Sequence, residues 1–419
     1  MNIKLALSTV ALCGLAAVPS ASGQDATRAY AAELASDAAG RESLLAGGGG
    51  AGYEKGRFQL YDDSKTNLLW IGGHFQFRYN ANFRSNDSSA GGNDEFTHGF
   101  QMRRTRLRMG GSIWDKNLTY FLHIDANRAN GDWTLLDSYG QYKWDNGLAV
   151  RWGQFKLPFL REENVADAVT LAAEASVTHS IFTQGRSQGV QFEYTAEKFK
   201  VAGAFSDGFT TLNTDFNSAR ESDYALTGRF DWLFAGNDFK RFDDFTSFRS
   251  QDYTGDLGVA VHYQDGGETG GTLDRGSFSA VVDTQVEGRG WNFHAAGIFR
   301  NTQDDTGADS AEFDDYGMVV QAGFFVSDQV ELFGRFDVVF ADNDRSADAS
   351  TDDTFHTLTA GTNYYISPES HAAKFTADVQ YFFNPEGDLS IVSPSTSTGL
   401  LADGEDGQVQ LRLQMQVMF

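Results

Sequence analysis

Cysteine and proline are nearly absent from this chain of 419 residues, which has one cysteine and five prolines. With Cys13 as the only cysteine, no disulfide can hold the fold together. Basic residues are also few: 33 Lys and Arg stand against 57 Asp and Glu, and the formal charge of −24 excludes a nucleic-acid partner. No run of about eighteen apolar residues follows residue 23, which excludes a transmembrane helix there.

Glycine and phenylalanine are abundant instead, with 45 and 35 copies. Turns use glycine, strands favour aromatic residues, and helix interiors tolerate glycine poorly. The composition therefore predicts an all-β fold. The eight histidines and the acidic residues show no metal-ligand spacing, and no glycine-rich loop precedes a helix, so we expect no metal and no cofactor.

The N-terminus has the pattern of a signal peptide over residues 1–23. Lys4 precedes an apolar stretch at 5–17, and small residues at 21–23 fit a cleavage site. Residues 24–65 are predicted to be a periplasmic N-terminal segment, either a short helix or disordered, because alanines at helical spacing give way to a run of glycines.

Strict alternation begins after this segment. Every second residue of 69–83 is apolar or small, and the interleaved set includes His74 and Arg78. A strand of about 9–11 residues can cross a bilayer at a tilt, and the polar set suits a wet lumen better than a packed core. Residues 66–419 are therefore predicted to form a transmembrane, antiparallel, up-and-down β-barrel, placed among the lipid and lipopolysaccharide of a Gram-negative-type outer membrane.

The alternation recurs in about sixteen segments, and an even number is typical of such barrels. Short turns, expected in the periplasm, alternate with longer acidic loops, expected outside. The connection 235–252 breaks this rule: it is either an insertion or a missed pair of strands, which would make about eighteen. The last segment, 409–419, ends on an aromatic residue, as outer-membrane barrels generally do. The predicted strand centres lie near residues 75, 107, 124, 139, 151, 191, 203, 228, 259, 282, 295, 320, 335, 360, 378 and 412.

The densest group of basic residues lies in one predicted strand. Arg104, Arg106 and Arg108 share a face. Facing lipid, each would cost about 2–4 kcal/mol at the midplane, so we expect them in the lumen. There they attract anions, or pair with acids such as Asp125 and Asp137 and stiffen the wall, and both roles can hold together.

The connection 157–186 has no strand alternation, and its middle, 167–176, is predicted to be a short helix. A loop of this length inside a compact fold is usually functional. We expect it to fold inward and narrow the pore; the alternative is an ordinary surface loop.

Four stretches resemble the phosphate-selective porin O and P family. Residues 99–107 (GFQMRRTRL) are similar to its F-x-[IL]-R-R-A-R-L strand, and 136–139 (LDSY) to its L-x-D-A-Y strand. Residues 150–159 (VRWGQFKLPF) resemble its [VI]-G-Q-F-K-x-P-F strand and loop, and 186–190 (RSQGV) its G-R-x-x-G-V strand. Their order and spacing also agree with the family.

The resemblance implies a sixteen-stranded, trimeric porin whose third loop folds inward and whose arginines select anions. By matched motif, the constriction would involve Arg103, Arg104 and Arg106 on the wall and Asp137 opposite. Arg161 and Arg186 would come from the loop or lie beside it. The scarcity of lysine and the excess of acid depart from the family, so anion preference is a hypothesis.

The sequence thus predicts a diffusion porin for small hydrophilic solutes, with anions such as phosphate preferred. The alternative is an occluded structural or adhesive barrel with no transport role. An enzyme is not expected: His123 and Asp125 share a face, but no serine in a nucleophile setting accompanies them.

Overall fold

The computed structural model describes residues 30, 32–33, 49–54, 56–85, 95–126, 128, 130–216, 218, 220–266, 275–304, 311–345, 352–384, 391, 398–403 and 405–419. The chain forms two units, residues 1–50 and 51–419. In the first unit the structure describes little; Tyr30, Ala32 and Glu33 are helical, and the rest of the helix predicted before residue 47 lies outside the described residues.

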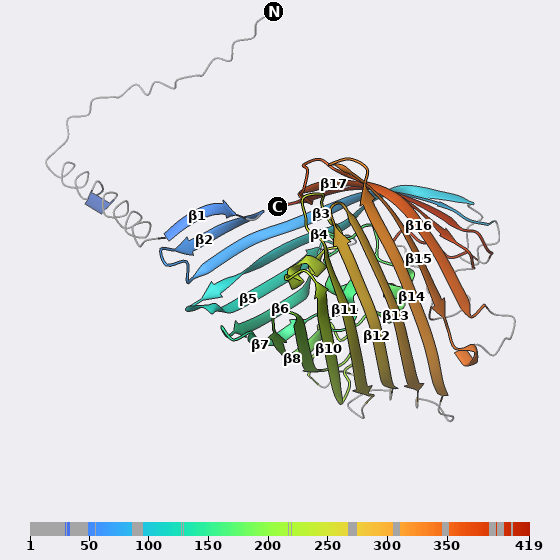
Figure 1. The fold of residues 1–419 in the computed structure, drawn as a ribbon, viewed down its shortest axis with the longest axis horizontal. Helices are drawn as coiled ribbons and strands as arrows, with labels where there is room; N and C mark the ends of the chain where they lie inside the picture. Colours follow the sequence, from blue (N-terminus) through green and yellow to red (C-terminus); the bar gives the residue numbers. More distant parts are fainter. Residues whose placement is uncertain are drawn as a thin grey trace, which may run out of the picture. The chain divides into compact units, whose positions relative to one another are not determined.

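The second unit is a closed antiparallel barrel. Within the described residues its wall has sixteen strands, each hydrogen-bonded to the next. Figure 1 shows the strands running side by side around the barrel. They are β3 (Leu68–Phe83), β4 (Phe96–Ile113), β5 (Asp115–Ala126), β6 (Trp133–Lys143), β7 (Leu148–Phe155), β8 (Ser187–Thr195), β9 (Phe199–Ser206), β10 (Tyr224–Ala235), β11 (Thr254–Asp265), β12 (Arg275–Gly288), β13 (Trp291–Asp304), β14 (Ala311–Phe325), β15 (Val330–Phe340), β16 (Thr354–Tyr365), β17 (Ala373–Phe382) and β18 (Val409–Met418).

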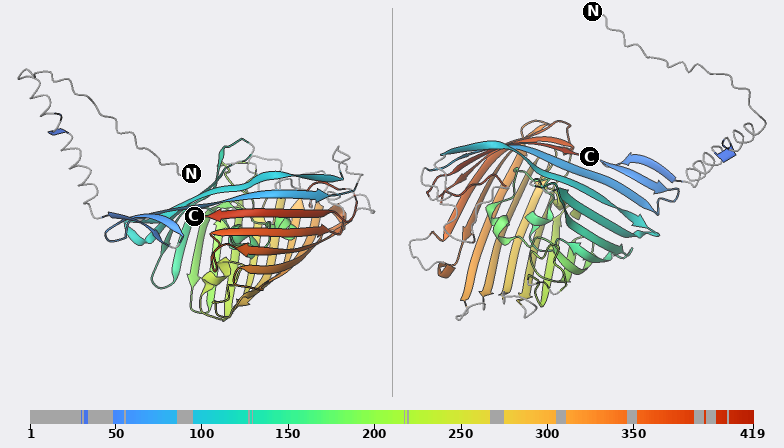
Figure 2. Two further views of the ribbon diagram at one scale, coloured as in Figure 1. Left: turned by 90° about the horizontal axis from the view of Figure 1, so that it is seen from above. Right: turned by 180° about the vertical axis from the view of Figure 1, so that it is seen from behind.

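The first and last wall strands close the barrel. β18 pairs with β3 in a continuous register that runs from Val409 opposite Phe83 to Met418 opposite His74. The backbone of Phe419 adds two hydrogen bonds to Gly73, of 2.7 and 2.9 Å. The two strands lie side by side in the left view of Figure 2, the last in red and β3 in blue. The all-β barrel prediction is confirmed, and every predicted strand centre falls inside one of these strands.

Two further strands precede the wall. β2 (Arg57–Asp62) pairs with β3 at Leu68–Ile71, just beyond the point where β18 ends, and β1 (Gly49–Glu54) pairs with β2. These strands were not predicted, because residues 24–65 were expected to form a short helix or to be disordered.

The connection between β10 and β11 holds no strand. Residues 236–253, which we call the β10–β11 insertion, contain a 3-10 helix, η1 (Phe239–Asp243). The eighteen-strand alternative based on this segment is therefore wrong, and the insertion alternative is correct. A second short 3-10 helix, η2 (Asn343–Arg345), follows β15.

The alternating pattern places apolar side chains outside and polar ones inside. Phe75, Phe77 and Phe83 on the outer face of β3 are exposed, whereas His74 and Arg78 are buried in the lumen. Trp114, Trp144 and Trp232 are exposed near the short-turn end of the barrel, as expected of an aromatic girdle. No helix among the described residues is long and apolar enough to span a membrane.

Candidate functional site

The connection between β7 and β8 runs inside the barrel. Residues 156–186, which we call the β7–β8 loop, contain two short helices, α2 (Arg161–Asn164) and α3 (Val177–Phe182). Ser176 caps α3 by accepting a hydrogen bond from the backbone of His179. The helix predicted at 167–176 is wrong, since those residues form turns and bends between α2 and α3.

Lumen side chains explain why this middle stretch is not helical. Each helical residue would bond its backbone to its own chain, but here the wall takes these groups. Ala173 donates its N–H to Asp378 at 2.8 Å. Several of the loop's carbonyls also accept from the wall: that of Ala168 from Gln416, Thr170 from Lys374, Leu171 from Asn363, Ala173 from Arg78, and Glu174 and Ala175 from Arg335.

Glu174, near the end of this stretch, is held by three wall arginines. Its carboxylate lies 2.7 Å from Arg78 and 2.8 Å from Arg104, and it also pairs with Arg103. Burial alone would raise the pKa of Glu174, but the charges of Arg104, Arg103 and Arg78 outweigh it and hold the pKa well below the usual value.

A bulge in β4 brings Arg103 to this cluster. Opposite β3, Gln76 pairs with Arg104 and Phe77 with Met102, so Arg103 is an extra residue without a partner. A bulge lets two consecutive side chains reach the same side of a sheet. Arg103 and Arg104 therefore both reach Glu174, although simple alternation would place only one of them on the lumen side.

Arg161 in α2 is held by acids on the far side of the barrel. It lies 2.7 Å from Asp283, 2.6 Å from Asp256 and 3.2 Å from Asp231. Arg229 bridges two of these acids at 2.7 and 2.8 Å. The β7–β8 loop is thus fixed to β3 and β4 through Glu174, and to β10, β11 and β12 through Arg161.

The remaining predicted residues lie around β4, β5 and β6. Arg106 pairs with Asp125 at 3.0 Å and with Asp167 of the loop. Arg186 pairs with Asp137 at 3.2 Å. Arg108 contacts the ring nitrogen Nδ1 of His74 at 3.1 Å. These contacts support the wall-stiffening alternative for Arg106.

Asp137 is not opposite the arginines, which corrects one expectation. In the strand register Arg108 is paired with His123, and His123 with Asp137. The His123 ring nitrogen Nδ1 lies 2.9 Å from the Asp137 carboxylate. Asp137 therefore belongs to the same wall, two strands from β4. His123 pairs with Asp137 and not with Asp125, its neighbour on the same face of β5.

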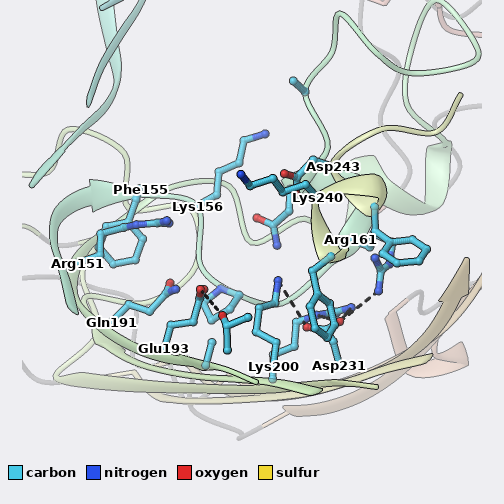
Figure 3. Close-up of a pocket in the computed structure, with 18 of the residues that line it drawn as sticks. Arg151, Phe155, Lys156, Arg161, Gln191, Glu193, Lys200, Asp231, Lys240 and Asp243 are labelled. Carbon is cyan, nitrogen blue, oxygen red and sulfur yellow. Dashed lines mark hydrogen bonds and ion pairs between the residues drawn. The ribbon is translucent and has the colours of Figure 1, made fainter. Parts of the chain in front are cut away.

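A cavity of about 730 Å³ remains beside the loop. Figure 3 shows its lining, with Arg151 from β7, Lys156 from the loop and Lys240 from η1 directed toward one space. Of the seven predicted site residues, Arg106, Arg108, Asp137, Arg161 and Arg186 line this cavity. Arg103 and Arg104 do not line it, because Glu174 engages them.

Burial affects the charged groups of the non-strand segments that line this cavity. It lowers the pKa of Lys156 to about 8, although Glu163 opposes the shift from 3.3 Å away. It also raises the pKa of Asp243 in η1. Both shifts favour the neutral form of the side chain.

The β10–β11 insertion is the part of the site that sequence reasoning missed. It turns into the barrel from the short-turn end, and Phe245 donates its backbone N–H to Val169 of the loop at 3.3 Å. The Phe245 ring packs with Val165, Leu171, Ala172 and Phe333. Its unusual length was the only signal, since the aromatic residues have no period that would show which way it folds.

Two loops from the other end of the barrel also enter. In the β9–β10 connection, residues 207–223, the Phe209 ring stacks on His262 with centroids 3.6 Å apart, and Thr210 donates its backbone N–H to Gln184. In the β17–β18 connection, the Thr398 carbonyl accepts from Arg78 at 3.2 Å. Connections from both ends therefore occupy much of the lumen.

Residues 74–384 match the family model described as phosphate-selective porin O and P. No curated protein sequence matches the chain significantly.

Solved porin structures share the fold. The OmpF of Salmonella typhi, in complex with daunomycin, is 14% identical with a TM-score of 0.57, over 84% of this chain and 98% of that one. An anion-selective porin from Comamonas acidovorans is 12% identical with a TM-score of 0.55, over 84% and 99%. A trimer form of OmpT from Vibrio cholerae is 12% identical with a TM-score of 0.52, over 84% and 99%. At this level of identity the likeness is one of fold.

Proposed function

We propose that the lumen of this protein passes small hydrophilic solutes and prefers anions. The premise is that the chain belongs to the phosphate-selective porin O and P family and is an outer-membrane porin. Family and fold both point to a channel rather than an enzyme. The solute is a small anion of the size and charge of phosphate.

The observation that carries this proposal is a local reversal of charge. The whole chain has a formal charge of −24. The cavity, in contrast, is lined by ten basic and eight acidic side chains. Among these acids, Asp137, Asp167, Asp231 and Asp256 are paired with arginines. A low-dielectric channel focuses the field of its lining, so a small excess of cations can favour anions there.

Three cations of the cavity lining are at most partly neutralised. Arg151 contacts Gln141 at 2.9 Å and lies over the Tyr139 ring, and no ion pair among the described residues includes it. Lys240 is likewise in no ion pair of the described chain, and Lys200 is 3.9 Å from Asp231. We assign the anion path to these three residues together with Arg106, Arg108, Lys156 and Arg186.

The test is a planar-bilayer recording with the purified protein. In a KCl gradient the reversal potential is expected to have the sign of chloride preference. The double variant Arg151→Gln, Lys240→Gln should reduce that preference, because two unpaired charges leave the path. Cation preference in the wild-type protein would contradict the proposal.

An occluded barrel is the second candidate, and one observation favours it. The β7–β8 loop, the β10–β11 insertion and two further connections all enter the lumen. Such a barrel would insert into bilayers without conducting. Absence of any step in conductance, from protein that resists SDS unfolding at room temperature, would support this candidate.

The remaining proposals concern assembly and processing. We propose removal of residues 1–23 on export and a periplasmic location for 24–65. Support comes from β2 alone, which pairs with the start of β3 at the short-turn end. A homotrimer is supported by the trimer form of the Vibrio cholerae OmpT, which has the same fold. Crosslinking in membranes, followed by gel electrophoresis, tests the trimer directly.

A further inference from the structure

Three neighbouring lumen side chains of β3, β4 and β5 carry buried polar atoms that lack a hydrogen-bond partner among the described residues. These atoms are Nε2 of His74, Nε of Arg108 and Nε2 of His123. His74 is 1% and His123 5% exposed. Buried polar atoms are nearly always paired, so a group of three on adjacent strands calls for a physical explanation.

The hydrogen bonds made by the Nδ1 atoms of the two histidines determine whether each unpaired Nε2 is a donor or an acceptor. Two N–H groups of Arg186 reach the carboxylate of Asp137, at 3.2 and 3.3 Å. An ionised carboxylate only accepts, so Nδ1 of His123 donates to Asp137, and in the neutral ring Nε2 carries a lone pair. Nδ1 of His74 accepts from Arg108, so Nε2 of His74 carries a hydrogen. The group thus offers two donors and one acceptor.

Arg108 also keeps its charge available. No ion pair within the described residues joins it to a carboxylate, since its polar contact is the neutral ring of His74. Arg108 and His123 are register partners across β4 and β5, and both line the cavity. A guanidinium and a histidine acceptor therefore lie next to one another in the lining of the channel.

We propose that His123 is a specificity-determining residue that makes the channel favour oxyanions carrying a hydroxyl over those that carry none. This inference rests on the proposed anion path. Arg108 donates to an oxygen of the anion, and the anion's own hydroxyl donates to Nε2 of His123. Near neutral pH, phosphate has at least one hydroxyl and sulfate has none. Sulfate would set an oxygen lone pair against that of His123, and its buried nitrogen would stay unpaired.

The experiment measures block of chloride current by phosphate and by sulfate in planar bilayers containing the full chain. For the wild type, phosphate should half-block the current at a concentration roughly tenfold below that of sulfate, as one good hydrogen bond to a charged group provides. His123→Phe should bring the two concentrations to within about twofold of one another. Comparing variants cancels the difference in charge between the two ions.

Two further variants keep the test decisive. His123→Gln retains an acceptor oxygen and should keep part of the preference, and it also serves if His123→Phe does not fold. His356, near the outer end of β16, does not line the cavity, so His356→Phe is a matched control that should keep the full preference.

The outcomes separate the two proposals. Absence of chloride current or a preference for cations overturns the anion porin itself. Anion current with equal block by phosphate and sulfate, or a preference that His123→Phe leaves unchanged, overturns the role of His123 alone. The second result would assign the unpaired nitrogen to an ordered water.

Discussion

At the scale of single residues, the β7–β8 loop is held by two charges of opposite sign. Glu174 engages three arginines on β3 and β4, and Arg161 engages three aspartates on β10, β11 and β12. Removing one partner of a buried ion pair costs far more than the pair contributes, because the other charge remains buried. These two residues therefore control both the position of the loop and the charge of the wall.

Glu174→Gln is expected to increase anion preference. The three arginines lose their common carboxylate, and one net positive charge appears beside the channel. The same change should destabilise the barrel by about 3 kcal/mol. A more anion-selective reversal potential and a lower urea midpoint in detergent would agree with this. Asp328→Asn, in an exposed pair with Arg249 at 3.3 Å, is the control and should alter neither.

Lys156 should make anion preference depend on pH. Burial lowers the pKa of Lys156 to about 8, so its charge is present below that pH and is lost above it. Anion preference is expected to fall between pH 6.5 and pH 9.5 as this cavity charge disappears. Lys156→Arg should flatten the profile, because arginine stays charged throughout. A wild-type profile that is flat, or one that rises with pH, would contradict this assignment.

The alternation of side chains predicted which arginines enter the lumen but not what they contact there. Arg104, Arg106 and Arg108 face inward, as the cost of placing them in lipid requires. Arg103 reaches the lumen only through a bulge, and period-two reasoning cannot locate an inserted residue. The partners Glu174 and Asp167 come from a loop about 60–70 residues away, and their position depends on the tertiary fold.

At the scale of elements, the lumen is filled by connections that enter from opposite ends. The inward fold of the β7–β8 loop was predicted from its length and its flanking motifs. Its apolar partners were not, because wall residues such as Ile298 and Val319 are apolar on the lumen side and break the polar pattern. The β10–β11 insertion had no motif, and it folds inward because Phe245 and Phe248 are buried there.

Phe245→Ala should widen the channel. The ring packs against Val165, Leu171 and Ala172 of the β7–β8 loop, and truncating a buried Phe costs about 3–5 kcal/mol. Since the loop remains fixed by Glu174 and Arg161, the insertion is the part expected to move. Single-channel conductance should rise. Phe216 is fully exposed, and Phe216→Ala should leave the conductance unchanged.

At the scale of the whole molecule, strand number and closure were the most predictable features. Each strand carries its own period-two signal, and the even count follows from closing an antiparallel sheet whose two ends lie on the same side. β1 and β2 escaped prediction because they are only six residues each, too short for alternation to stand out from the surrounding sequence.

Deleting Phe419 is expected to impair closure. Its backbone makes the last two hydrogen bonds between β18 and β3, and its ring lies so close to Gly73 that an added Cβ there would be 3.1 Å from it. The fraction of protein that migrates as a compact band in unheated SDS gels should fall. Phe419→Tyr keeps both the backbone and the ring, so it should assemble normally. Equal assembly of the deletion would show that the seam does not need this residue.

The position of the seam sets an order for folding. Gln76 and Gln416, which are hydrogen-bonded across it at 2.8 Å, are separated by 340 residues. Gln416 also holds the Ala168 carbonyl of the β7–β8 loop. The ribosome must therefore release nearly the whole polypeptide before β3, the first wall strand, can pair with β18. Until then the unpaired edge of β3 is open to aggregation, so the exported chain must be kept unfolded until it reaches the membrane. Because Gln416 contacts both β3 and the β7–β8 loop, the loop must enter the lumen as the barrel closes.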